Sequence, residues 1–127
     1  MSIALYSALA TVAAHGELAI GELADAECLP SSAATRATDH LEEVGLVERR
    51  RNPIDRRGVN VAITPEGRVF VDEQRRKGNA WLADRLGRLG RTQRATLAEA
   101  LDVLEALVAD EERTGAVAGA TRKAVTR

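Results

Sequence analysis

Residues 41–67 read LEEVGLVERRRNPIDRRGVNVAITPEG, and this stretch decides the fold. Side chains alternate well enough over 47–51 and 59–63 to predict two antiparallel strands. The residues NPID between them have the composition of a tight turn. Thr64 and Pro65 then predict the start of a helix, because Thr caps a helix and Pro suits its first turn. We therefore expect a hairpin that lies between two helices.

The hairpin is strongly basic. Five arginines and a single acid lie within residues 49–57. Fixed positive charge on a tight turn suits contact with phosphates or entry into a minor groove. A helix followed by a basic hairpin is the layout of a winged helix-turn-helix, a module that binds duplex DNA, so we expect residues 47–63 to form its wing. The candidate DNA-binding residues of this wing are Arg49, Arg51, Asp55, Arg56 and Arg57.

The composition places the chain in a broad class. Its 127 residues predict one domain, and the hydrophobic content of 45% with few aromatic residues favours packing of helices over a β-sandwich. A single cysteine excludes an intramolecular disulfide, and no apolar run is long enough to predict a membrane span. We therefore expect a cytoplasmic protein that does not enter a membrane.

The charge is distributed unevenly along the chain. Residues 1–35 and 95–112 contain acids but no Lys or Arg, so most of the 18 basic residues lie between these two segments. Screening limits the reach of a charge to about 10 Å at ordinary salt. A net charge of −1 is therefore compatible with DNA binding, since the local charge decides.

Three helical segments precede the hairpin. They are predicted over residues 2–14, over residues 20–27 and from Pro30 to Gly45, with glycines as stop signals. In the third segment, four apolar residues recur at helical spacing and are expected to form its buried stripe. These four residues are Ala34, Ala37, Leu41 and Val44.

The opposite face of the third segment is small, polar and basic. Such a surface at the start of a helix fits the major groove, where an arginine can donate two hydrogen bonds to guanine. We therefore expect this segment to be a recognition helix that reads double-stranded DNA. Its candidate DNA-binding residues are Ser31, Ser32, Ala33, Thr35, Arg36 and His40.

Two long helices are predicted after the hairpin, the first from Pro65 to about Leu89 and the second capped by Thr92. Apolar residues recur along one face of both, and helices of this length with one apolar face usually need a partner. We expect a homodimer, with intramolecular packing as the alternative. The candidate dimerisation residues are Trp81, Leu86, Leu97, Leu101, Leu104 and Val108.

The expected organisation is a winged helix-turn-helix over residues 1–90, with dimerisation helices over 65–112 in the same domain. A frayed or disordered tail is expected over residues 113–127, since the segment is rich in Gly, Ala and Thr without periodicity. The predicted fold class is mainly α with a small β-hairpin, or α+β.

Several motifs resemble the MarR family of bacterial winged helix-turn-helix transcriptional regulators. The resemblance covers about residues 3–110. The segments that carry it are GELA at 21–24, SSAATR at 31–36, DHLE at 39–42, GLVER at 45–49, DRR at 55–57 and ITPEGR at 63–68. The Asp-x-Arg wing paired with the Thr-x-x-Gly exit is fairly specific to this family.

The resemblance implies a homodimer that reads a short palindrome, usually as a repressor. Release by a small phenolic or lipophilic effector, or by oxidation, is usual in the family. At the position of Arg57 the family places an arginine that enters the minor groove, and Asp55 would hold it extended through an ion pair. Family members also carry a further helix before the segment that begins here at Met1, and it helps to build the dimer interface.

The sequence gives little support for a redox, metal, cofactor or catalytic site. Cys28 has no partner cysteine and no nearby basic residue, so we interpret it as a small buried residue and not as a redox sensor. With two histidines and no ligand spacing, no metal site is expected, and neither a cofactor site nor a set of catalytic residues can be assembled. The alternative from another class is a protein-interaction module whose basic hairpin docks an acidic partner.

Overall fold

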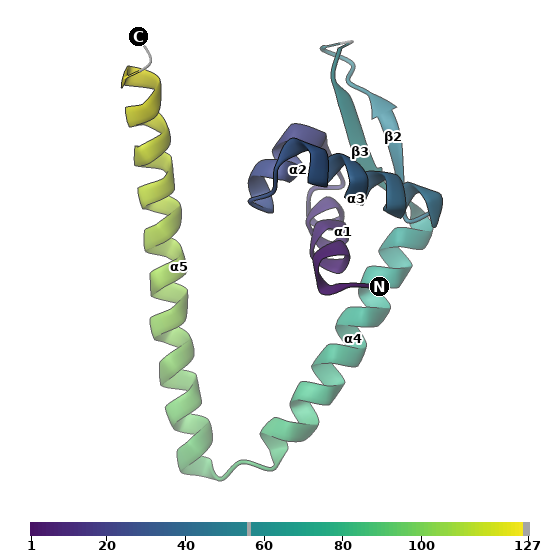
Figure 1. The fold of residues 1–127 in the computed structure, drawn as a ribbon. Helices are drawn as coiled ribbons and strands as arrows, with labels where there is room; N and C mark the ends of the chain where they lie inside the picture. The colour runs from purple at the N-terminus through teal and green to yellow at the C-terminus, as the bar shows by residue number, and fades with distance from the viewer. Residues whose placement is uncertain (56, 126–127) are drawn as a thin grey trace. The chain divides into compact units, whose positions relative to one another are not determined.

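The computed structural model describes residues 1–55 and 57–125, with side chains through residue 109. Within these residues the chain forms five helices and three strands (Figure 1). In order they are α1 (Ile3–His15), β1 (Glu17–Ala19), α2 (Ile20–Ala26), α3 (Ser31–Glu43), β2 (Val47–Arg51), β3 (Val59–Ile63), α4 (Pro65–Gly87) and α5 (Arg91–Val125). The chain divides into two compact units, Met1–Ala80 and Trp81–Arg127.

The sheet is antiparallel and has three strands in the order β1-β3-β2. The predicted hairpin is confirmed, with Arg49 opposite Val61 and Arg51 opposite Val59. The sequence analysis missed β1, which pairs Leu18 with Val61 on the other side of β3. A three-residue strand gives almost no periodic signal, and its partner is far away in the sequence. β3 is therefore the central strand, and β2 lies at an edge.

The core of the first unit is aliphatic, as the composition predicts. Helices α1, α2 and α3, the sheet and the start of α4 all contribute to it. Its buried residues are Ala8, Leu9, Val12, Leu18, Leu23, Leu41, Leu46, Val47, Val61 and Val71. This core supports both the third helix and the base of the hairpin.

Helix α3 turns a narrower face inward than the sequence predicted. Ala34 and Leu41 are buried as expected and Ala37 is half-buried, but Val44 is 51% exposed, and Thr38, which was not predicted, is fully buried. Thr38 is tolerated there because its hydroxyl donates to the carbonyl oxygen of Ala34 at 2.8 Å. The prediction for Val44 is wrong because the helix ends at Glu43, so the helical periodicity does not extend to it.

The exit from the hairpin is fastened to the turn between α3 and β2. The hydroxyl of Thr64 accepts from the N–H of Gly67 at 3.0 Å and donates to the carbonyl of Gly45 at 2.7 Å. The N–H of Thr64 donates to the carbonyl of Leu46 at 3.2 Å. A Cβ on Gly67 would lie 2.0 Å from that same carbonyl oxygen, so no side chain fits there. The Thr-x-x-Gly motif therefore closes α4 onto the base of the hairpin.

The second unit contains the end of α4 and helix α5. The prediction that Thr92 caps α5 is wrong, because the helix begins at Arg91 and the side chain of Gln93 accepts from the N–H of Gly90 at 3.1 Å. Helix α5 extends to Val125, past the point near Arg113 where the sequence predicts the loss of regular structure. Disorder of the tail stays a prediction.

Many large apolar side chains of the second unit are exposed to solvent in the single chain. Leu86 is half-buried. The exposed set comprises Trp81, Leu82, Leu97, Leu101, Val103, Leu104, Leu107 and Val108. The guanidinium of Arg85 lies 4.3 Å from the centre of the Trp81 ring. Within residues 1–55 and 57–125, no helix is both long and apolar enough to cross a membrane.

Candidate nucleic-acid interface

Helix α3 presents its polar face to solvent. Five of the six candidate recognition residues are exposed, and Ala33 is half-buried. The hydroxyl of Thr35 donates to the carbonyl of Ser31 at 2.9 Å, which leaves its oxygen able to accept a hydrogen bond. Arg36 lies one residue further along the same exposed face, so small, polar and basic groups project together from the first turns of the helix.

The tip of the hairpin is ordered by its own polar groups. The side-chain oxygen of Asn52 accepts from the N–H groups of Ile54 and Asp55, at 2.9 and 3.2 Å. The backbone closes the turn, since the N–H of Asn52 donates to Gly58 and the N–H of Gly58 donates to Asp55. Hydrogen bonds within residues 52–58 therefore close the turn.

The role expected for Asp55 requires a correction. Its carboxylate accepts from the backbone N–H of Arg57 at 3.0 Å, and among the described residues it forms no ion pair with the guanidinium. Asp55 thus holds the backbone at Arg57 while leaving the side chain free to extend. The reason is geometric: a short carboxylate reaches the amide two residues on more easily than the end of a long side chain.

The remaining wing arginines differ in their surroundings. In the part of the chain that the structure describes, the guanidinium groups of Arg51 and Arg57 have no hydrogen-bond or ion-pair partner, and both residues are exposed. Arg56 lies outside the described residues. Two of the predicted wing cations are therefore available to an external anion.

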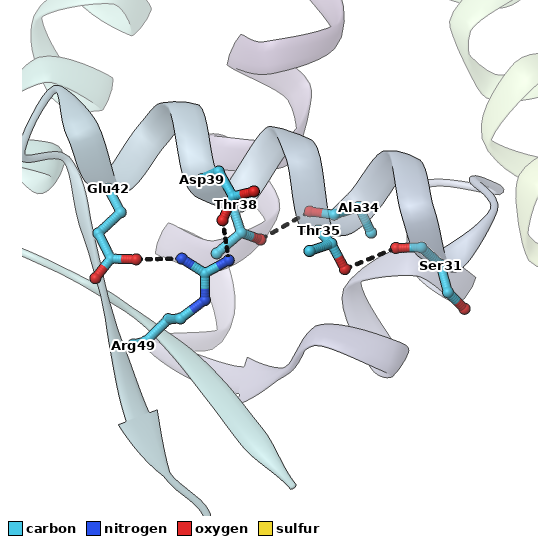
Figure 2. Close-up of polar contacts among 7 residues, drawn as sticks. All are labelled: Ser31, Ala34, Thr35, Thr38, Asp39, Glu42 and Arg49. Atoms are coloured by element: carbon cyan, nitrogen blue, oxygen red, sulfur yellow. Dashed lines mark hydrogen bonds and ion pairs between the residues drawn. The ribbon is translucent and has the colours of Figure 1, made fainter.

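Arg49 is held by the protein itself. Its guanidinium donates to the carboxylates of Asp39 and Glu42 on α3, as Figure 2 shows. Partial desolvation lowers the pKa of Arg49, but the hydrogen bonds and charges of the two acids outweigh it and raise the pKa above its ordinary value. The guanidinium is therefore charged at physiological pH, and its charge is balanced by the two carboxylates of α3.

Arg50 also forms ion pairs within the protein, on the opposite face of the sheet from Arg49. Its Nε donates to Glu48 at 2.7 Å, and its Nη1 lies 3.7 Å from the carboxylate of Glu17 on β1. The hydrogen bond and charge of Glu48 raise the pKa of this guanidinium, with a further contribution from Glu17. Two of the five wing arginines therefore serve contacts inside the domain.

Sequence reasoning missed these internal partners. Asp39 and Glu42 are three residues apart, a spacing that places them on one face of a helix, and this signal was available. Their meeting with Arg49 depends on the turn that folds β2 back along α3. Since that turn was predicted only in outline, the ion pairs could not be derived from it.

Cys28 is exposed, so the prediction that it is buried is wrong. It lies in the loop between α2 and α3 and adopts a positive φ of 53°. The residue lies in a loop outside the core cluster, and loops usually run over the surface of a protein. In the described residues, no group of three His, Cys, Asp or Glu side chains could hold a metal ion.

Comparison with known proteins identifies the family of this chain. The sequence profile of the MarR family matches residues 1–59. An uncharacterised HTH-type transcriptional regulator of Mycobacterium bovis, Mb0904, is 38% identical over 108 residues, which cover 85% of this chain and 76% of that protein. The chain belongs to the MarR family.

Solved structures of MarR proteins have the same fold. The YusO protein of Bacillus subtilis has a TM-score of 0.74 and 28% identity, covering 83% of this chain and 74% of that chain. A cysteine-to-serine mutant of MarR from E. coli bound to operator DNA has a TM-score of 0.65 and 27% identity, covering 82% and 75%. The predicted MarR membership and winged-helix fold are confirmed, and the protein is a transcriptional regulator and not an enzyme.

Proposed function

We propose that this MarR-type regulator is a homodimeric repressor that binds a palindromic operator in double-stranded DNA. The observation that carries the proposal is the joint exposure of the polar face of α3 and of the unpaired wing arginines. Each recognition helix would read one half-site, and the two half-sites would lie about 34 Å apart, one turn of DNA. The wings would enter the flanking minor grooves through Arg57.

The exposed apolar residues of the second unit support a dimer. Trp81, Leu97, Leu101, Leu104 and Val108 are each at least 41% exposed in the single chain. An apolar stripe of this size, repeated at helical spacing, would be costly to leave in water. A second copy of the chain, packed along the stripe, would cover it. Size-exclusion chromatography with light scattering would measure the mass expected for two chains.

A small lipophilic or phenolic effector is part of the proposal. An open hollow of about 450 Å³ lies against α1 and α4, with Tyr6 and Phe70 among the residues that line it. Aromatic walls with a few polar groups suit a small apolar ligand. The test is to add a small phenol to the complex of the protein with operator DNA. Release of the protein from the DNA would support an effector site.

The decisive experiment is a fluorescence-anisotropy titration on duplex DNA from upstream of the protein's own gene, over a range of salt concentrations. Replacing Arg57→Ala should weaken binding to all duplexes and reduce the slope of log K against log salt by about one unit per protomer. Arg76→Ala, on the exposed surface of α4, removes the same charge away from the interface and should leave the slope unchanged.

An unchanged affinity and slope for Arg57→Ala would overturn the assignment of the wing. A wild-type protein that binds no duplex would overturn the function as a whole. Competition separates the alternative role: if the hairpin docks an acidic protein partner and binds no DNA, an excess of random duplex DNA would not displace that partner.

A further inference from the structure

Arg49 is the middle residue of β2, on the side of the hairpin tip that faces the domain and not in the tip itself. One guanidinium nitrogen donates to Glu42 and another donates to Asp39, so the group bridges two acids (Figure 2). Its side chain is 28% exposed, compared with 59% for Asp39 and 40% for Glu42. The arginine is thus less accessible to an external phosphate than the acids that bind it.

The two acids lie on the same helix as the candidate recognition residues. Asp39 precedes His40 directly, and Arg36 is three residues earlier on the helix. Carboxylates near DNA repel its phosphates over distances within the screening length, about 10 Å at ordinary salt. Without a counter-charge, Asp39 and Glu42 would oppose the binding that the rest of α3 favours.

The ion pairs also connect strand β2 of the wing to α3, the candidate recognition helix. A guanidinium has a rigid fork of donors and can hold two carboxylates at once, which the point charge of a lysine does poorly. By binding two successive acids on one helical face, Arg49 limits how far β2 can tilt against α3. The direction of the wing relative to the recognition helix depends on this base.

We propose that Arg49 is a positioning residue for DNA recognition and not a ligand of phosphate. It neutralises acids on the recognition helix and holds the base of the wing against that helix. This inference rests on the proposed DNA-binding function, and it replaces the expectation that Arg49 contacts DNA directly.

The first test compares Arg49→Met with Arg51→Met in the same salt-dependent titration on operator DNA. Arg49→Met should lower affinity about ten-fold, because two carboxylates lose their counter-charge beside DNA, and since salt screens that repulsion the loss should be largest at low salt. Arg51→Met should reduce the slope by about one unit per protomer. An Arg49→Met protein that binds operator DNA with the affinity of the wild type at every salt concentration would overturn the proposal.

The second test is rescue. Adding Asp39→Asn and Glu42→Gln to Arg49→Met removes the charges that Arg49 is proposed to neutralise, so at least three-fold of the lost affinity should return. A direct phosphate ligand could not be replaced in this way, and a triple variant as weak as Arg49→Met would contradict the inference. The acid pair alone, Asp39→Asn with Glu42→Gln, leaves Arg49 free and should tighten binding to random duplex DNA.

Stability without DNA separates this inference from the proposed function. In thermal unfolding, the destabilisation caused by Arg49→Met should be smaller when Asp39 and Glu42 are already neutral. Additive effects would show that the bridge does not hold the wing, whether or not the protein binds DNA. A wild-type protein that binds no duplex while the stability effects remain coupled would remove the proposed function and leave the bridge established.

Discussion

The base and the tip of the wing contain the same kind of residue in opposite circumstances. At the base, Arg49 is bound by acids of α3 and pairs across the sheet with the buried residue Val61. At the tip, Arg57 is exposed in a turn that hydrogen bonds among its own residues close. Equal charge therefore does not mean equal role: at the base the charge stabilises the protein, and at the tip it is available to a partner.

The largest effect is expected from a substitution of Gly67 at the base of the wing. A Cβ there would lie 2.0 Å from the carbonyl oxygen of Leu46, so Gly67→Ala must displace backbone. We expect a loss of about 3 kcal/mol or more in the free energy of unfolding, measured by chemical denaturation.

The matched control lies at the tip. A Cβ on Gly58 would meet its nearest atom, the carbonyl oxygen of Asp55, at 3.4 Å, so Gly58→Ala should cost less than about 1 kcal/mol. Equal losses for the two variants would mean that the tip is as tightly packed as the base.

The tip can be tested next through Asp55, by comparing Asp55→Ala with Asp55→Asn. Asparagine keeps the oxygen that accepts from the N–H of Arg57, whereas alanine removes it. We expect Asp55→Ala to bind operator DNA about five-fold more weakly than Asp55→Asn in an anisotropy titration, with unchanged thermal stability. If Asp55 acted instead through an ion pair with Arg57, both variants would be equally impaired.

The smallest expected effect concerns Ile54, whose side chain is 95% exposed at the tip. A wing that enters a minor groove would bury part of this side chain against the sugar walls. Ile54→Ser should therefore weaken operator binding about three-fold, since roughly one buried CH₂ is lost, and the salt slope should not change. An equal loss on a duplex too short to reach the wing would exclude this contact.

Local signals explain what the sequence predicted well. The helix stop at Gly16 and the turn at Gly45 rest on glycines with positive φ, and Thr64 caps α4 as expected. Both hairpin strands match their predicted bounds. Each of these features depends on residues within a few positions of one another, so it can be recognised before the fold is known.

Several of the missed features depend on the path of the chain between distant residues. Strand β1 forms because it pairs with β3, and Cys28 is exposed in the loop between α2 and α3 although its residue type favours burial. The bridge from Arg49 to α3 needs the actual path of the chain between them. The candidate recognition face could be predicted because it lies opposite the buried residues of α3, which recur at helical spacing.

The narrow attachment of α3 has a consequence for how such regulators diverge. The helix is anchored through Ala34, Thr38 and Leu41, and the one buried hydroxyl among them is satisfied within the helix. Substitutions of outward residues other than Asp39 and Glu42, which bind Arg49, therefore leave this anchoring unchanged. After gene duplication, a copy of this protein could acquire a new operator by exchanging a few outward residues, without passing through an unfolded intermediate.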